Sequence, residues 1–216
     1  MKKLAYLLLA AFLVTNYSIA QTKYPEPVVT KVSKSDQDDK AFMLNYYQQT
    51  LDNLNKSVAG LTEEQLNFKP APDRWSISQC LEHIVTTEKM LFEMTKKGME
   101  APANPEDRDD IKVTDEQVIA GMTDRSHKAQ APEQLLPDGK YKDAQTAIAD
   151  LEKARKPILE YINAVPLDEL RNHVGKSPMG SFDSYQSFLY IPGHTARHTA
   201  QIEEVKADNN FPKIKK

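Results

Sequence analysis

Cysteine and glycine are both scarce in this chain of 216 residues, which has one cysteine, Cys80, and seven glycines. A single cysteine cannot form an internal disulfide, so the fold must be stabilised by packing. There is no glycine-rich loop of the kind that binds phosphate. No block or stripe of basic residues is present either, which argues against binding to nucleic acid. A composition this low in glycine favours helices.

A long apolar run is also missing. The segment Leu4–Val14 is apolar but too short to span a bilayer. It follows two lysines and precedes Ser18-Ile19-Ala20, whose small side chains suit a cleavage site, and this order is typical of a secretory signal peptide over residues 1–20. We therefore expect a bacterial Sec-type export signal, a periplasmic or extracellular protein without a stable membrane anchor, and Gln21 as the mature N-terminus. An N-terminal anchor that is retained is the alternative.

The mature chain has the size of one domain. Cleavage after residue 20 of the 216 leaves 196 residues, and the loss of two lysines leaves 26 basic and 31 acidic residues, a net charge of −5. Residues 21–35 contain two prolines and are predicted to form an extended arm. We expect one helical domain over residues 36–208 and a short tail over 209–216.

Apolar side chains recur at helical spacing in four long segments. These segments cover about 36–57, 77–97, 142–163 and 181–208. Ser76 and Gln79 form a capping box at the start of the second segment, and Trp75 precedes it as a hydrophobic staple toward Cys80. The sequence therefore predicts an all-α protein built on four long helices.

The connections between these segments contain one further helix signal. Thr114 and Gln117 form another capping box, which predicts a shorter helix that ends near His127, between the second and third segments. Residues 166–180 are predicted to form a long loop.

Two prolines fall inside the predicted helices. Pro157 predicts a kink or a local break in the third segment, because proline cannot donate its backbone hydrogen bond. Pro192 has the same effect in the fourth segment. There the favoured interpretation is a continuous, bent helix, and the alternative is a helix that begins afresh at Gly193.

Three histidines are the main candidates for chemistry. His194 and His198 are four residues apart, which places both imidazoles on the inward face of the fourth helix. His83 lies on the apolar face of the second helix. Three neutral imidazoles from two helices form a facial set of metal ligands with positions left open. From spacing alone, this metal site and three separately hydrogen-bonded core histidines are equal alternatives.

Several other residues are predicted to lie near these histidines. Cys80 is predicted to be a small buried core residue rather than a nucleophile. Glu88 is predicted to be a solvated or boundary glutamate rather than a base. Three residues are candidates to orient an imidazole: Thr87, Tyr190 and Gln201. Neither of the two remaining histidines, His127 and His173, is assigned to the metal.

Two motifs carry a resemblance to a known family. Residues 75–83 read WSISQCLEH and residues 194–202 read HTARHTAQI, and together they resemble the DinB/YfiT-like superfamily. The resemblance implies a four-helix bundle with one long crossover, which here contains the extra short helix between bundle helices 2 and 3. It also implies a divalent metal ion held by His83, His194 and His198.

The resemblance and the site together lead to three functional hypotheses. The first is a metal-dependent hydrolase that acts on a small-molecule substrate through metal-bound water. The second is a metal-dependent thiol S-transferase, and the third is a non-catalytic bundle that binds a metal or a partner. Zinc is the default metal, and nickel, iron and manganese are compatible with the ligands. The resemblance further implies pairing as a homodimer.

Overall fold

The computed structural model describes residues 36–127, 130–177 and 180–213. The predicted signal peptide (1–20) and extended arm (21–35) lie outside the described residues. Within the described part of the chain, no helix has both the length and the apolar character needed to cross a membrane.

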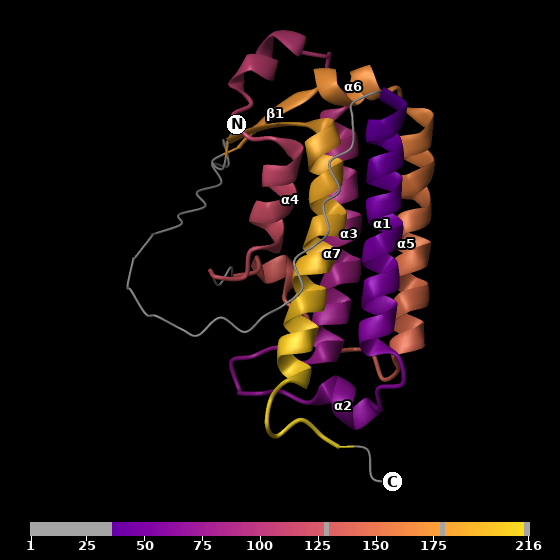
Figure 1. Cartoon of the computed structure of the whole chain (residues 1–216), viewed down its shortest axis with the longest axis vertical. Coiled ribbons are helices and arrows are strands. Elements are labelled where there is room, and N and C mark those ends of the chain that lie inside the picture. Colours follow the sequence, from indigo (N-terminus) through magenta and orange to yellow (C-terminus); the bar gives the residue numbers. More distant parts are fainter. Residues whose placement is uncertain (1–35, 128–129, 178–179, 214–216) are drawn as a thin grey trace, which may run out of the picture.

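Four long helices form the body of the protein (Figure 1). They are α1 (Asp36–Val58), α3 (Ile77–Gly98), α5 (Ala144–Ala164) and α7 (Ser184–Lys206). Helices α1 and α3 each pack against both α5 and α7, so the four helices stand at the corners of a square. The predicted all-α four-helix bundle is confirmed, and its long helices begin and end close to the predicted residues.

The helices run in the order down, up, up, down. The Tyr185 hydroxyl near the start of α7 donates to the Asp39 carbonyl near the start of α1, so these two packed helices begin at the same end of the bundle and run parallel. Helices α3 and α5 are also parallel, because the Ser78 hydroxyl at the start of α3 donates to the Tyr141 carbonyl just before α5. The connection between α3 and α5 must therefore return along the whole bundle, which makes it the long crossover.

The crossover contains η1 (Pro105–Asp110), α4 (Asp115–Thr123) and η2 (Glu133–Leu135). Helix α4 packs along the outside of α7 (Figure 1). Gly193 allows this close approach, since a Cβ atom at that position would lie only 3.2 Å from the Met122 side chain. The predicted extra helix between bundle helices 2 and 3 is confirmed. It ends at Thr123 rather than near His127.

A local hydrogen bond explains the early end of α4. The Asp124 carboxylate accepts hydrogen bonds from the backbone N–H and the hydroxyl of Ser126, at 2.8 and 2.9 Å. Such a side-chain turn competes with the next helical hydrogen bond and stops the helix.

The prediction of one long loop over residues 166–180 is wrong. This stretch contains α6 (Leu167–Asn172) and β1 (Val174–Ser177), which pairs antiparallel with β2 (Gly180–Asp183). Leu170 is fully buried and anchors α6 to the bundle. At the opposite end, α2 (Glu63–Asn67) begins with its own capping box at Thr62.

Both prolines lie inside unbroken helices. Helix α7 runs through Pro192, and α5 runs through Pro157. The continuity predicted around Pro192 is therefore confirmed, the alternative start at Gly193 is wrong, and a break at Pro157 is wrong. The bend at Pro192 and the kink at Pro157 stay predictions. Continuity of α7 matters because it keeps His194 and His198 in one helical register with the residues before Pro192.

The core has two apolar halves with a buried polar layer between them. One half lies toward α2 and includes Leu54, Leu81, Leu151 and Ile202. The other lies toward α6 and includes Met43, Phe92, Ile158 and Phe188. The polar layer, here called the Glu88 cluster, consists of Glu88 (α3), Arg155 (α5), Thr195 (α7), Thr50 (α1) and the Tyr47 carbonyl (α1). It joins all four bundle helices.

Candidate metal centre

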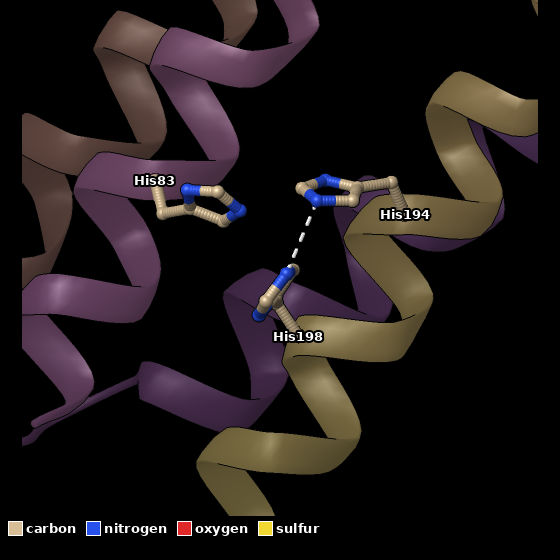
Figure 2. A group of neighbouring side chains, drawn as sticks. All are labelled: His83, His194 and His198. Atoms are coloured by element: carbon tan, nitrogen blue, oxygen red, sulfur yellow. Dashed lines mark hydrogen bonds between the residues drawn. The ribbon is translucent and has the colours of Figure 1, made fainter. Parts of the chain in front are cut away.

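The three predicted histidines come together between α3 and α7 (Figure 2). The capping box fixes the start of α3, because the Ser76 hydroxyl accepts from the Gln79 N–H and the Gln79 side chain accepts from the Ser76 N–H. His83 then lies about two turns into α3. Helix α7 runs antiparallel to α3 and presents His194 and His198 from one face.

The imidazoles are close enough to share one ion. One ring nitrogen from each of the three histidines lies within 4.8 Å of the other two. The Nε2 atoms of His194 and His198 are 3.1 Å apart, the contact drawn as a dashed line in Figure 2. All three side chains are buried, with at most 7% exposed. We call this group the imidazole cluster.

Two of the rings have an outer hydrogen bond that fixes which nitrogen faces the centre. Nδ1 of His83 lies 2.9 Å from the Leu135 carbonyl oxygen, and Nδ1 of His198 lies 2.9 Å from Oε1 of Gln201. Both oxygens can only accept, so each Nδ1 carries the proton. Each Nε2 is then left with a lone pair, and Figure 2 shows one ring nitrogen of His83 pointing toward His194.

His194 differs from the other two histidines. Its Nδ1 is buried and has no hydrogen-bond partner among the described residues. If His194 donates from Nε2 to His198, its Nδ1 keeps a buried and unused lone pair, which is costly. If Nδ1 carries the proton instead, its buried N–H has no acceptor among the described residues, and two Nε2 lone pairs face each other at 3.1 Å. A cation between the two Nε2 atoms would remove the repulsion of these lone pairs.

Burial keeps the imidazoles neutral. Burial is the main cause that lowers the pKa of His194 to about 3, and repulsion of the charged form by His83 and Arg197 contributes to the same shift. Burial also lowers the pKa of His198 well below its ordinary value, with help from the two neighbouring histidines. The pKa of His83 is lowered by burial and partly restored by the Leu135 carbonyl. Neutral imidazole is the form that binds a metal.

The nitrogen separation suits a shared metal ion. A zinc–nitrogen bond is about 2.0–2.1 Å, which places two ligands of a tetrahedral ion roughly 3.3 Å apart and two adjacent ligands of an octahedral ion roughly 2.9 Å apart. The observed 3.1 Å between His194 and His198 lies between these values. The donor set, the neutral rings and the spacing of His194 and His198 therefore fit a divalent transition metal.

Trp75 covers one side of the imidazole cluster. Its ring centroid is 4.8 Å from that of His83 and 5.9 Å from that of His198, and it is nearly parallel to the latter ring. The sequence predicted Trp75 only as a helix-entry staple and missed this contact. Trp75 precedes the N-cap Ser76, so the helical periodicity of α3 does not include it and gave no signal for this contact.

The predicted neighbours of the imidazoles have different outcomes. Gln201 does orient His198. The Thr87 hydroxyl lies almost equally far from Nδ1 and Nε2 of His83, at 3.4 and 3.5 Å, so it does not select one nitrogen, whereas the Leu135 carbonyl bonds Nδ1 at 2.9 Å. Tyr190 has no hydrogen bond to any of the three rings. Cys80 is fully buried, as predicted, and burial raises the pKa of its thiol to about 12. It is therefore not a reactive nucleophile.

The prediction that Glu88 is solvated or at a boundary was wrong. Glu88 is fully buried and pairs with Arg155 at 2.6 Å. Arg155 belongs to the inward stripe of α5, between buried residues one turn away on either side, and it compensates the carboxylate charge. His127 is exposed and His173 is held by two backbone carbonyls, so neither belongs to the imidazole cluster.

Fold and site together define a helical protein in which a buried three-histidine centre lies between two helices of a four-helix bundle. The sequence matches the family model of the DinB superfamily over residues 46–202. The chain belongs to this superfamily, as the motifs around the histidines indicated.

Two similar proteins come from Bacillus subtilis. The uncharacterized protein YuaE of strain 168 is 27% identical over 153 residues, which cover 69% of this chain and 88% of YuaE. The solved structure of YfiT is 14% identical with a TM-score of 0.57, and the match covers 88% of this chain and 98% of YfiT. YfiT is described as a probable metal-dependent hydrolase with an unusual four-helix bundle topology. At this identity the likeness supports the fold.

Proposed function

We propose that this protein is an exported metal-dependent hydrolase whose divalent metal ion is held by His83, His194 and His198. The observation that carries the proposal is the convergence of three neutral imidazoles, two of them with outer hydrogen bonds that turn an Nε2 lone pair inward. The description of YfiT as a probable metal-dependent hydrolase supports the same activity.

The ligand set decides which chemistry is available. A divalent ion on three imidazoles, with positions left open, polarises a carbonyl or phosphoryl oxygen and lowers the pKa of the water that it binds. Zinc is the first candidate because it accepts neutral nitrogen ligands and needs few of them. Nickel, iron and manganese are the competitors that a metal analysis must separate.

The chain's own residues hold and shield the centre. The Leu135 carbonyl and the Gln201 carboxamide keep the protons of His83 and His198 on the outer nitrogens. The Trp75 ring excludes water from one side of the cluster. Among the described residues, the two carboxylates considered as general bases are both paired, because Arg155 engages Glu88 and Arg125 engages Glu204.

This lack of a free acid or base favours a second candidate, a non-catalytic metal-binding bundle. A polar group that transfers protons must be available to the substrate, and each of these two carboxylates already has an arginine partner. A metal-dependent thiol S-transferase, which would use the same three ligands, is the third possibility to assay.

The test combines metal analysis with activity assays. The purified protein is analysed for bound metal and then assayed for hydrolysis of esters, amides and phosphoesters and for transfer of a low-molecular-weight thiol. We expect bound metal and hydrolysis that His194→Ala abolishes. His127→Ala is the matched control, since it removes an exposed imidazole that does not belong to the imidazole cluster.

Each outcome separates the candidates. Thiol transfer without hydrolysis would identify the transferase, and bound metal with neither activity would identify the binding module. A protein that binds no divalent metal at neutral pH would overturn all three.

Export and pairing are further parts of the proposal. The expected mature protein begins at Gln21, and the mass of the protein recovered from the periplasm or the medium measures this. A homodimer is expected from the family resemblance, and sedimentation equilibrium measures it. Retention of residues 1–20 would contradict export, and a monomer at micromolar concentration would contradict pairing.

A further inference from the structure

A single arginine links the crossover to the imidazole cluster. Arg125 follows α4, and its guanidinium spans two residues of α7. Nε and Nη2 donate to the two carboxylate oxygens of Glu204 at 2.6 and 2.8 Å, and Nη1 donates to Oε1 of Gln201 at 3.4 Å. This two-point bond to Glu204 fixes the plane of the guanidinium, and so aims Nη1 at Gln201.

The Gln201 oxygen is shared between this arginine and the cluster. The same Oε1 atom accepts the Nδ1 proton of His198 at 2.9 Å. The Gln201 side chain is only half-buried, so packing alone does not determine the rotation of its carboxamide. Two donors on one side of the carboxamide require its oxygen there, because the NH2 group would repel both.

A second arginine holds the segment that carries Arg125. Arg197 on α7 is buried, and its guanidinium donates to the backbone carbonyls of Met122, Asp124 and His127. The contacts are therefore reciprocal: Arg197 of α7 donates hydrogen bonds to the crossover, and Arg125 of the crossover donates hydrogen bonds to α7. Arg125 is placed firmly enough to act on a side chain of α7.

We propose that Arg125 is a positioning residue for the metal centre: it fixes the Gln201 carboxamide, which holds His198 with Nε2 toward His83 and His194. The inference rests on the metal site proposed above. It makes the crossover part of that site, because the Leu135 carbonyl, from the same crossover, holds His83 in the matching way.

For the removal of Arg125, the loss of its charge and the loss of its positioning role predict opposite changes in metal affinity. A guanidinium near the centre repels a cation, so removal of its charge alone would tighten metal binding. Removal of a residue that positions a ligand weakens metal binding. The direction of the change in affinity therefore separates the two roles.

Arg74 supplies the matched control. Its Nη2 lies 3.4 Å from the same Glu204 carboxylate, but Arg74 makes no hydrogen bond to Gln201 among the described residues. Arg74→Ala removes a cation beside Glu204 and leaves the Gln201 carboxamide held. Arg125→Lys keeps the charge and loses the planar fork.

The experiment is a Co²⁺ titration of the full-length purified protein and its variants. Quenching of the fluorescence of Trp75, the only tryptophan, reports binding because its ring lies against two of the imidazoles. Gln201→Ala is expected to weaken binding about tenfold to a hundredfold, the range for an outer partner of a metal ligand. Arg125→Ala, one hydrogen bond further out, is expected to weaken it about threefold to tenfold.

Three further results are expected from the same titration. Arg74→Ala leaves the affinity unchanged or slightly tighter, and Arg125→Lys does not restore the wild-type value. In the Gln201→Ala background, Arg125→Ala has no additional effect, because its route to His198 is already gone. Equal or tighter binding by Arg125→Ala would overturn the inference, as would a further loss in the Gln201→Ala background.

A second measurement does not depend on metal. Long-range ¹H–¹⁵N spectra of the metal-free protein report which nitrogen of His198 carries the proton. We expect Nδ1–H in the wild type and in Arg74→Ala, and a larger share of Nε2–H in Arg125→Ala. An unchanged His198 tautomer in Arg125→Ala would refute the role of Arg125. Absence of Co²⁺ binding by the wild type, with the tautomer shift present, would count against the proposed function alone.

Discussion

The interior of the bundle holds two buried polar clusters that share helices α3 and α7 but differ in how fully they bond themselves. In the Glu88 cluster, each nitrogen of the Arg155 guanidinium has an acceptor, and the Thr195 hydroxyl accepts from Arg155 while it donates to Glu88 at 2.5 Å. In the imidazole cluster, His83 and His198 each have an acceptor for the outer Nδ1–H, and the Nε2 atoms of His194 and His198 are in contact at 3.1 Å. Nδ1 of His194 has no hydrogen-bond partner among the described residues.

This difference separates a structural cluster from a binding site. A buried polar group costs free energy unless it is paired, and the Glu88 cluster meets that cost within the chain. The imidazole cluster meets it only in part, because Nδ1 of His194 has no hydrogen-bond partner among the described residues and the Thr87 hydroxyl lies as far as 3.5 Å from Nε2 of His83. Adjacent residues fall on opposite sides of this division, because Thr195 serves one cluster and His194 the other.

The largest effect is expected from removing one charge from the Glu88 cluster. Glu88→Gln removes the charge that compensates Arg155 and leaves a buried guanidinium without its partner. The free energy of unfolding should fall by about 3–5 kcal/mol. Urea denaturation measures it. The double variant Glu88→Leu/Arg155→Met removes both charges and should recover most of the loss, whereas a cost below about 1 kcal/mol for Glu88→Gln would show that this cluster tolerates an unpaired member.

Removing one ring from the imidazole cluster tests whether the cluster binds a metal. His194→Ala should weaken Zn²⁺ binding by more than about a hundredfold, beyond the range for an outer partner, because it removes a direct ligand. Isothermal titration calorimetry measures the affinity, with His127→Ala as the control. Retention of wild-type affinity by His194→Ala would mean that the cluster is a set of core histidines and not a metal centre.

Acid should also reduce the stability of the metal-free protein through the imidazole cluster. The folded-state pKa of His194 is about 3, against an ordinary value of 6.5, so below pH 6.5 the unfolded state binds the proton first. The part of the folding free energy that depends on neutral His194 is thus fully present above pH 6.5, and it is lost as the pH falls toward 3. At pH 5.5 the expected loss is about 1 kcal/mol for each histidine with such a depressed pKa.

Urea denaturation at pH 7.5 and pH 5.5 measures this loss. His194→Ala should reduce the difference between the two pH values, and His127→Ala should leave it unchanged. An equal pH dependence in the wild type and His194→Ala would contradict the buried, neutral state of this ring.

Local signals were sufficient to predict the frame of the site. The capping box at Ser76 predicted where α3 begins, and the four-residue spacing of His194 and His198 predicted their common face. Both signals depend on hydrogen bonds and geometry within one or two turns of helix, so a single sequence contains them. The continuity of α7 through Pro192 was predicted on the same local basis.

Features set by distant partners were not predictable in this way. Glu88 was predicted to be solvated or at a boundary from its position around the helix, whereas its burial depends on its partner Arg155, which lies 67 residues away. The Leu135 carbonyl that orients His83 is a backbone atom and has no signature in the sequence. The strand β1 likewise depends on Asn104, whose side chain bonds both the N–H and the carbonyl of Val174.

The smallest expected effect comes from the residue at the boundary between the two clusters. Thr195→Val keeps the shape of the side chain but removes the hydroxyl that joins Glu88 and Arg155, so the free energy of unfolding should fall by about 1 kcal/mol. Thr199→Val, one turn further along α7, is the control, because the Thr199 hydroxyl bonds only a carbonyl of its own helix. Zn²⁺ affinity should change less than about threefold in Thr195→Val, since no ligand or outer partner is lost. If Thr195→Val instead weakened Zn²⁺ binding as strongly as Gln201→Ala, the Glu88 cluster would be part of the metal centre's support, and the division between a closed structural cluster and an open binding cluster would be wrong.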